Sequence, residues 1–242
     1  MASQLTGPVI VAAQGIYSDS SLQLHGLGER VESNDGRAFR YCKVGVTALV
    51  PGKLYQSPAE DTTNFQQLTV TAPSAAATSV VTTTTVTLSA NDLAEGFMCI
   101  VSATTNAGQV FKIKSHAAAA AAVATFNLED PVMYAPTGTV VIDCHPNPYK
   151  NVIVAPTTES SSPVGAALYK VTAAQYGWLQ VFGPCPLVAV GAITVGDEVI
   201  TAGATTTGGV SVAGSATISS PVGYALTGIA DTAYGLVFLQ IG

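Results

Sequence analysis

The sequence predicts a mainly β protein: a compact β-barrel or β-sandwich body with an extended N-terminal arm and at most one or two short helices. A phrase recurs at a fixed offset, as SSPVGAAL at residues 161–168 and SSPVGYAL at residues 219–226. Runs rich in Val, Thr, Ile and Tyr alternate with Gly and Pro over much of the chain, as in β proteins. Charged residues are only 10% of the chain, so Thr, Ser, Asn and Gln must supply most of the polar surface.

The duplicated phrase predicts one β-hairpin used twice. Tyr176-Gly177 returns as Tyr234-Gly235 at the same offset of 58 residues. In each case Pro-Val-Gly opens a short strand and Tyr-Gly leads a second one. Two such hairpins are too few for a solenoid and suit a small barrel or sandwich with a shared core. The hairpins carry no reactive chemistry and indicate a scaffold. Trp178 and its counterpart 58 residues later are both expected to be buried.

Residues 1–36 form the first of three predicted regions. They are punctuated by Gly and Ser, lack sustained periodicity and predict an extended arm. We expect the apolar residues of this arm, with nearby arginines, to contact neighbouring subunits. These residues are Val9, Ile10, Val11, Ile16, Tyr17, Leu22, Leu24, Arg30, Arg37 and Arg40.

The second region, residues 37–148, is β-rich, and the third, residues 149–242, is a β-barrel region that holds the duplicated hairpin. VGVTALVPG at residues 44–52 resembles VGAITVG at residues 190–196, which suggests that residues 37–57 share a core with the third region. The alanine run at 117–122 is short for a stable helix, so a helical turn and an irregular segment are equally supported there. The remaining predicted strands are 38–44, 47–55, 68–71, 80–88, 97–101, 110–114, 123–128 and 138–143.

Charge and hydropathy exclude several partners. The net charge is −6 and the basic residues form no continuous stripe, so direct binding of nucleic acid is not expected. No apolar run approaches the roughly 18 residues of a membrane-spanning helix, and no membrane is expected as a partner. The even number of cysteines is compatible with two disulfides, but their wide spacing and the absence of a CxxC pair favour free, mostly buried thiols. They are Cys42, Cys99, Cys144 and Cys185.

The sequence predicts no catalytic, cofactor-binding or metal site, and therefore no enzyme. The three histidines are far apart, and Asp143-Cys144-His145 is the one suggestive cluster. Neighbouring side chains on a strand point to opposite faces, which favours a structural role for this triplet. The acidic pairs lie beside turn residues or strand ends, where solvated carboxylates are ordinary.

Seven short segments carry a family resemblance: GERVESNDGRAFRY at 28–41, VPGKLYQ at 50–56, IKSH at 113–116, LEDP at 128–131, NPYK at 147–150, YGW at 176–178 and PVGYAL at 221–226. Together they resemble structural proteins encoded by tailed bacteriophages. The C-terminal region is also similar to small β-barrel capsid decoration (cement) proteins. The resemblance implies a virion structural protein, made in the bacterial host cytoplasm, that binds the outside of the head shell and stabilises it. It implies the major capsid protein and the chain itself, as a homotrimer, as partners, and no cofactor.

Other functions remain open. A tail-tube or connector component would also be β-rich but would form six-fold rings. A receptor-binding fibre or adhesin module would favour exposed aromatic residues or metal sites at its loop tips.

Overall fold

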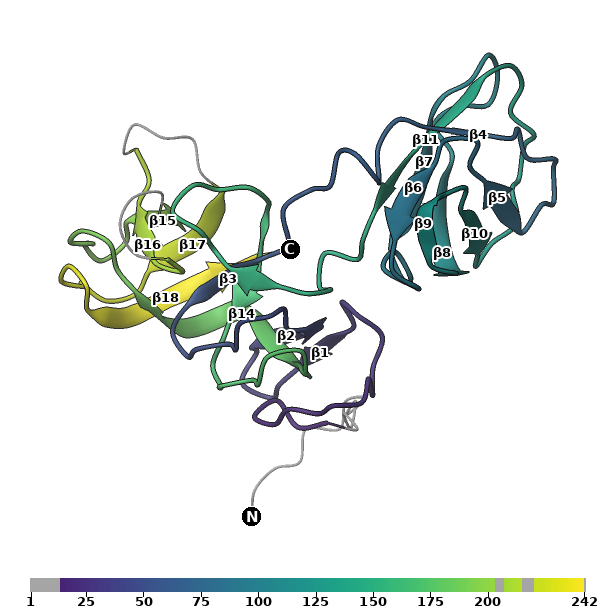
Figure 1. The fold of residues 1–242 in the computed structure, drawn as a ribbon. Helices are drawn as coiled ribbons and strands as arrows, with labels where there is room; N and C mark the ends of the chain where they lie inside the picture. Colours follow the sequence, from purple (N-terminus) through teal and green to yellow (C-terminus); the bar gives the residue numbers. More distant parts are fainter. Residues whose placement is uncertain (1–13, 203–206, 215–219, 242) are drawn as a thin grey trace. The chain divides into compact units, whose positions relative to one another are not determined.

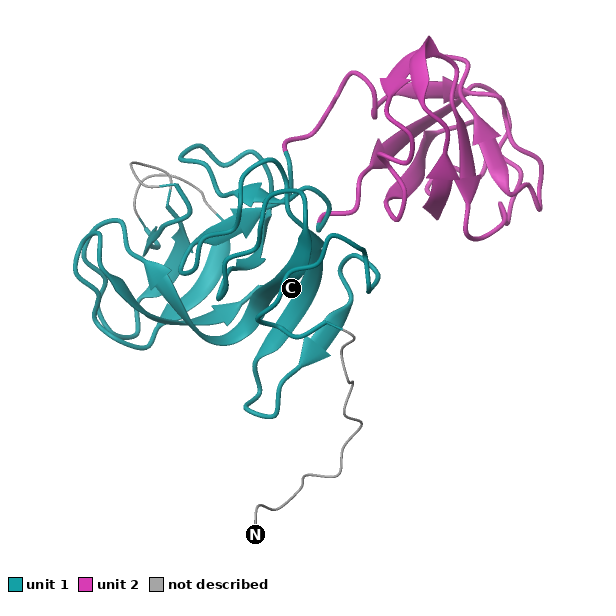
Figure 2. Cartoon of the chain, turned by 60° about the horizontal axis from the view of Figure 1, so that its bottom comes forward, with its two compact units in different colours: residues 1–58, 149–242 teal, residues 59–148 magenta. Residues whose placement is uncertain are grey.

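The computed structural model describes residues 14–202, 207–214 and 220–241, and these are built from strands, turns and bends without a helix. The chain forms two compact units (Figures 1 and 2). Unit 1 comprises residues 1–58 and 149–242, and unit 2 comprises residues 59–148. The prediction of a mainly β, barrel-like fold is confirmed. None of the described segments is a helix with the length and hydropathy needed to span a membrane.

Unit 1 is one strongly curved sheet of ten strands. Its order is β12-β3-β13-β14-β18-β17-β15-β16, with β2 beside β14 and β1 beside β2. The strands are β1 (Arg30–Glu32), β2 (Ala38–Lys43), β3 (Leu54–Gln56), β12 (Ile153–Val154), β13 (Pro163–Ala166), β14 (Tyr176–Val188), β15 (Glu198–Thr201), β16 (Val210–Val212), β17 (Pro221–Ala225) and β18 (Tyr234–Gln240).

The duplicated phrase forms the two predicted hairpins in the same register. Ala166 of β13 pairs with Gln180 of β14. Tyr224 of β17 and Phe238 of β18, each 58 residues further on, form the same pair. The likeness extends to strands outside the phrase, because β12 lies against β3 as β16 lies against β15. The sheet of unit 1 therefore contains one five-stranded motif twice.

The early segment of the chain belongs to the first of these motifs. Gly52 N donates to Ala167 O at 2.9 Å, and Gly196 N donates to Ala225 O at 2.9 Å. Strand β3 pairs with β13 as β15 pairs with β17, with a register shift at the same place. Strand β2 pairs with the first half of β14, and the second half of β14 pairs with β18 in the same way. Strand β2 and the second half of β14 therefore occupy equivalent positions in the two motifs. We call residues 38–57 with 149–182 the first repeat, and residues 183–241 the second repeat.

Unit 2 is an insertion into the first repeat. In the second repeat, residues 202–209 connect β15 to β16. The equivalent strands of the first repeat, β3 and β12, are separated by residues 57–152, which contain all of unit 2. Residues 37–58 thus lie in unit 1 with residues 149–242, whereas the rest of the predicted β-rich region, residues 59–148, has its own fold.

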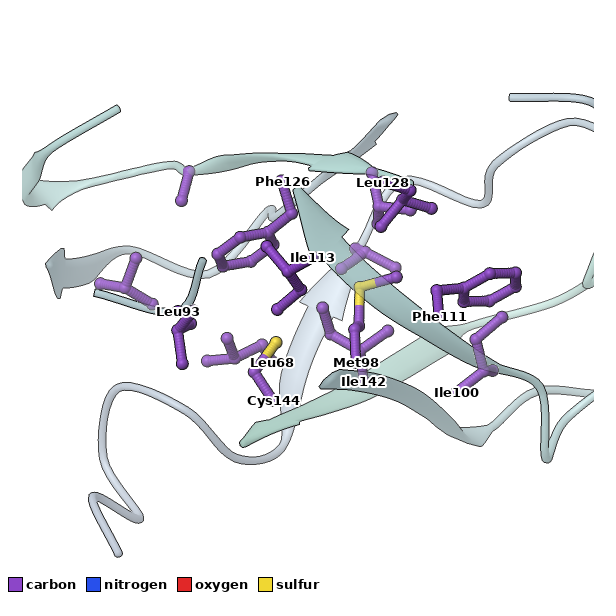
Figure 3. Packing of buried hydrophobic residues seen from close by; sticks show 14 of the residues in the cluster. Leu68, Leu93, Met98, Ile100, Phe111, Ile113, Phe126, Leu128, Ile142 and Cys144 are labelled. Atoms are coloured by element: carbon purple, nitrogen blue, oxygen red, sulfur yellow. The ribbon is translucent and has the colours of Figure 1, made fainter. Parts of the chain in front are cut away.

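Unit 2 is a six-stranded, nearly closed barrel. Its sheet order is β4-β11-β7-β8-β10-β5, and a bridge between Val70 and Thr82 brings the two ends together. Leu68, Met98, Phe126 and other apolar side chains fill its interior (Figure 3). The six strands are β4 (Leu68–Val70), β5 (Ser79–Val81), β7 (Phe97–Ser102), β8 (Val110–His116), β10 (Thr125–Leu128) and β11 (Val140–His145). Strands β6 (Val86–Leu88) and β9 (Ala119–Ala122) form a separate two-stranded sheet in the same unit.

Two local predictions need correction. The alanine run is neither a helical turn nor irregular, because residues Ala119–Ala122 form strand β9 against β6. A run this short gains little as an isolated helix, whereas the neighbouring strand offers its backbone groups partners. The predicted arm is also packed in its described part: β1 pairs with β2, and Gln14 is buried. Val9, Ile10 and Val11 lie outside the described residues.

Candidate interaction surfaces

The outer face of the first repeat carries large aromatic side chains that residues 14–32 cover. Phe39 and Tyr41 of β2 pack with Trp178 of β14 and with Val31 of β1. The His25 ring lies 5.1 Å, between centroids, from both Tyr41 and Trp178. We call residues 14–32 the covering segment. Because of these contacts, this segment, which was predicted to be an extended arm, packs on unit 1.

Gln14 fixes the start of the covering segment by hydrogen bonds. Its carbonyl oxygen accepts from Trp178 Nε1 at 3.1 Å, and its side-chain oxygen accepts from Tyr41 Oη at 2.8 Å. Its amide Nε2 donates to Tyr176 O at 3.0 Å. Buried indole and phenol groups need such partners, since an unpaired buried donor costs about 1–3 kcal/mol. The aromatic face and the covering segment therefore depend on each other.

The same face of the second repeat has no cover among the described residues. Leu236 is equivalent to Trp178, and Phe238 to Gln180, by the 58-residue offset. Trp178 is 2% exposed, whereas Leu236 is 42% exposed. The expectation that both are buried is therefore wrong for the second repeat. The inner face is filled in both repeats; what differs is the layer outside the sheet.

The uncovered surface is continuous across three neighbouring strands. The Phe238 ring stacks on Tyr224 and meets Phe182 edge-on, with centroids 5.1 Å apart in each pair. Charged residues are absent from this set, and several of its side chains are more than a third exposed. Contiguous apolar surface of this kind marks interaction sites. We call it the open face: Phe182, Pro184, Pro186, Tyr224, Leu236 and Phe238.

The open face was not predicted from the sequence, although an apolar run in the sequence indicates it. Residues 234–239 read YGLVFL, an almost unbroken apolar run. A strand with one solvated face alternates, whereas a strand covered on both faces is apolar throughout. The run therefore indicated that β18 is made to be covered on both sides.

The predicted contact residues that the structure describes are apolar residues of the covering segment and three arginines. Ile16 packs beside the Trp178 cluster, whereas Tyr17, Leu22 and Leu24 are exposed. The arginines are engaged within the chain. Arg30 pairs with Glu32 at 2.9 Å, Arg37 pairs with Asp35 at 2.7 Å, and Arg40 Nη1 donates to Gly28 O at 2.8 Å.

Unit 2 carries a separate apolar groove of about 640 Å³. The Gln109 amide holds one wall in place: Nε2 donates to Tyr134 O at 2.8 Å and Oε1 accepts from Tyr134 N at 3.1 Å. Asn106 Nδ2 adds a bond to Ala135 O at 2.8 Å. These bonds leave Met133 and Tyr134 well exposed. The other walls are Ala75, Ala76, Val110, Phe111, Asp130, Pro131 and Val132.

The Asp143-Cys144-His145 triplet does not converge. Cys144 points into the core of unit 2, while His145 is exposed and Asp143 accepts from Gln67 N at 2.7 Å. Burial raises the pKa of Cys144 to about 12, so the thiol stays protonated at neutral pH. The described residues include no group of three or more His, Cys, Asp or Glu side chains placed to hold a metal ion.

Comparison of the chain with family models, with curated proteins and with solved structures gives no match.

Proposed function

We propose that this chain is a virion structural protein of a tailed bacteriophage, and that it decorates and cements the outside of the head shell as a homotrimer. The proposal rests on the sequence resemblance to phage structural proteins and decoration proteins. One structural observation supports it: the second repeat has an uncharged open face, whereas the covering segment covers the equivalent face of the first repeat.

The open face suits a protein that works by being covered. Isolated apolar residues on a surface are ordinary, but a run of aromatic, proline and leucine side chains over three adjoining strands is costly to leave in water. Burial of apolar surface contributes roughly 25 cal/mol per Å². Assembly with neighbouring subunits or with the shell would recover that contribution.

The position and copy number of the protein in purified particles test the proposal. Immunogold labelling or a particle reconstruction is expected to place it on the head in multiples of three per shell site, and native mass spectrometry of the free protein is expected to show a trimer. Six-fold rings in the tail or at the connector would replace the proposal with a tail-tube or connector role.

The groove of unit 2 favours a second candidate function, a receptor-binding module. Tyr134 and Met133 project from a loop that side-chain hydrogen bonds hold in place, as a recognition surface requires. Purified unit 2 that adsorbs to host cells and blocks infection would support this function. Loss of adsorption in Tyr134→Ser, with Tyr169→Ser in unit 1 of the full chain as the control, would assign it to the groove.

A further inference from the structure

The two repeats present one face twice, and the covering segment occupies only the first. Trp178 in the first repeat and Leu236 in the second have equivalent strand partners, Tyr41 and Pro186. Whatever lies on the open face is therefore expected to make contacts like those of the covering segment, in which Gln14, Ile16, His25 and Leu27 lie against the aromatic side chains of the first repeat.

Residues 1–13 hold apolar side chains that could make such contacts. They read MASQLTGPVIVAA, carry no charged side chain and contain the apolar run Val9-Ile10-Val11. They continue from Gln14, which is anchored on the Trp178 side of the same sheet. The described covering segment cannot serve the open face of another molecule, because it is already packed on its own first repeat.

Strand geometry disfavours attachment of this run within one molecule. Phe238 and Leu236 lie opposite Pro184 and Pro186. These prolines are six and eight residues beyond Trp178, or up to about 20 and 26 Å along the strand at about 3.3 Å per residue. Val9 lies five residues before Gln14 and reaches at most about 18 Å from it. If residues 9–13 were fully stretched to reach the open face of their own molecule, they could not also lie across that face. A linker too short to span two sites gives no advantage in effective concentration.

We propose that residues 1–13 of a second copy of this chain dock on the open face, with Val9, Ile10 and Val11 against Leu236 and Phe238. The proposal rests on the self-assembly included in the proposed function. Around a cyclic axis each subunit would give its N-terminal residues to one neighbour and receive those of another, which is a closed arrangement.

Cysteine cross-linking in the full-length protein tests this pairing. All variants carry Cys99→Ser, because Cys99 is the partly exposed native thiol. Protein with Ile10→Cys is mixed with differently tagged protein carrying Leu236→Cys and oxidised mildly. Disulfide-linked dimers that contain both tags are expected. Val46→Cys replaces Leu236→Cys in the control, since Val46 is highly exposed and follows Gly45, whose carbonyl oxygen accepts from Ala174 N before the start of β14, far along the chain from Pro184 and Pro186. This mixture is expected to give only background.

The double variant Ile10→Cys/Leu236→Cys separates the two possible sources of the segment. Chains linked to other chains are expected on a non-reducing gel. A monomer closed by an internal disulfide would overturn the proposal, as would cross-linking no stronger than in the control. In a second measurement, Leu236→Gln is expected to weaken self-association about tenfold, the factor that corresponds to about 1.4 kcal/mol, and Val46→Gln is expected to leave it unchanged.

The outcomes for docking and for function are distinguishable. If the protein is found on phage heads but the cross-link fails, the docking proposal is overturned and the function stands. If the cross-link forms but the protein is absent from heads, the proposed function is overturned and the docking of residues 1–13 stands.

Discussion

Trp178 and Leu236 occupy the same position in two copies of one motif, yet Trp178 is 2% exposed and Leu236 is 42% exposed. Each lies on the outer face of its strand, next to an equivalent partner strand. The covering segment makes the difference, because Gln14 and His25 lie on Trp178 and no described residue lies on Leu236 in this way. Identical position in a repeat therefore does not imply identical burial.

The first prediction concerns this pair. Trp178→Ala is expected to lower the free energy of unfolding of unit 1 by roughly 3–5 kcal/mol, the usual range for a large buried aromatic. Leu236→Ala is expected to change it by less than about 1 kcal/mol in the unassembled protein, because most of its destabilising effect requires burial. Urea unfolding of both variants and the wild type checks this. Equal losses would show that the two residues are covered alike.

The second prediction concerns Gly165 and Gly223, which are equivalent and have φ of 146° and 154°. A Cβ at Gly165 would lie 2.9 Å from Gln180 O, and one at Gly223 would collide with Phe238 O. Alanine at either position is expected to cost several kcal/mol, with the larger loss at Gly223. Gly196→Ala is the control, because its φ is 86° and nothing lies near its Cβ. It carries only the strain of a left-handed backbone, about 1–2 kcal/mol. Thermal unfolding of the three variants provides the comparison.

The third prediction concerns the insertion. If residues 59–148 are replaced by a four-residue linker, unit 1 is expected to fold, because residues 57–58 and 149–152 then complete a ten-residue connection between β3 and β12, close to the eight residues 202–209 between β15 and β16. Residues 59–148 alone are also expected to fold, since they have their own core. Circular dichroism and two-dimensional NMR of each piece check this. A shortened chain that lacks dispersed amide signals would show that unit 1 needs unit 2.

The fourth prediction concerns pH. Burial raises the pKa of Cys42, Cys144 and Cys185 from 9.0 to about 12. Below pH 9 both the folded and the unfolded chain keep these protons, so the thiols have no effect on stability. Between about pH 9 and 12 the unfolded chain loses them first, so the free energy of unfolding is expected to fall.

Two measurements check the fourth prediction. The free energy of unfolding of the wild type is expected to be lower at pH 10.5 than at pH 8. The difference between the two pH values is expected to be smaller for the double variant Cys42→Ala/Cys185→Ala. Iodoacetamide at pH 8 is expected to label Cys99 in the folded protein and the other three cysteines only after unfolding. Rapid labelling of Cys42 in the folded protein would contradict the burial.

The hairpin repeat could be predicted because its signal is local. Pro-Val-Gly and Tyr-Gly mark the same strand starts twice, and a 58-residue offset is visible without any knowledge of contacts. The weaker likeness of residues 44–52 to residues 190–196 also had a structural basis, since Gly52 and Gly196 make equivalent bonds. In the structure, however, Val44 is equivalent to Ala189 and not to Val190. Val44 bridges to Val152, and Ala189 bridges to Val210, the equivalent of Val152 in the second repeat.

The covering segment and the insertion could not be predicted because their signals are non-local. Gln14, His25 and Leu27 look like parts of a polar, glycine-punctuated arm until a partner face is known. Residues 59–148 are richer in Thr and Ala than the flanking chain, but this difference in composition does not show that they fold separately. Their separate fold follows only from which strands pair, and pairing over long sequence distances leaves little trace in one sequence. The open face differs in this respect, because the apolar run at residues 234–239 is a local signal for it.

The insertion has a consequence for how this chain can change. One connection between two strands of unit 1 accommodates a whole extra barrel, and the sheet around it keeps the register of its uninterrupted twin. The twin connection, between Thr201 and Val210, is then a natural attachment point for a foreign domain of similar size. A carrier of two different cargoes could be made from this scaffold by grafting at that site.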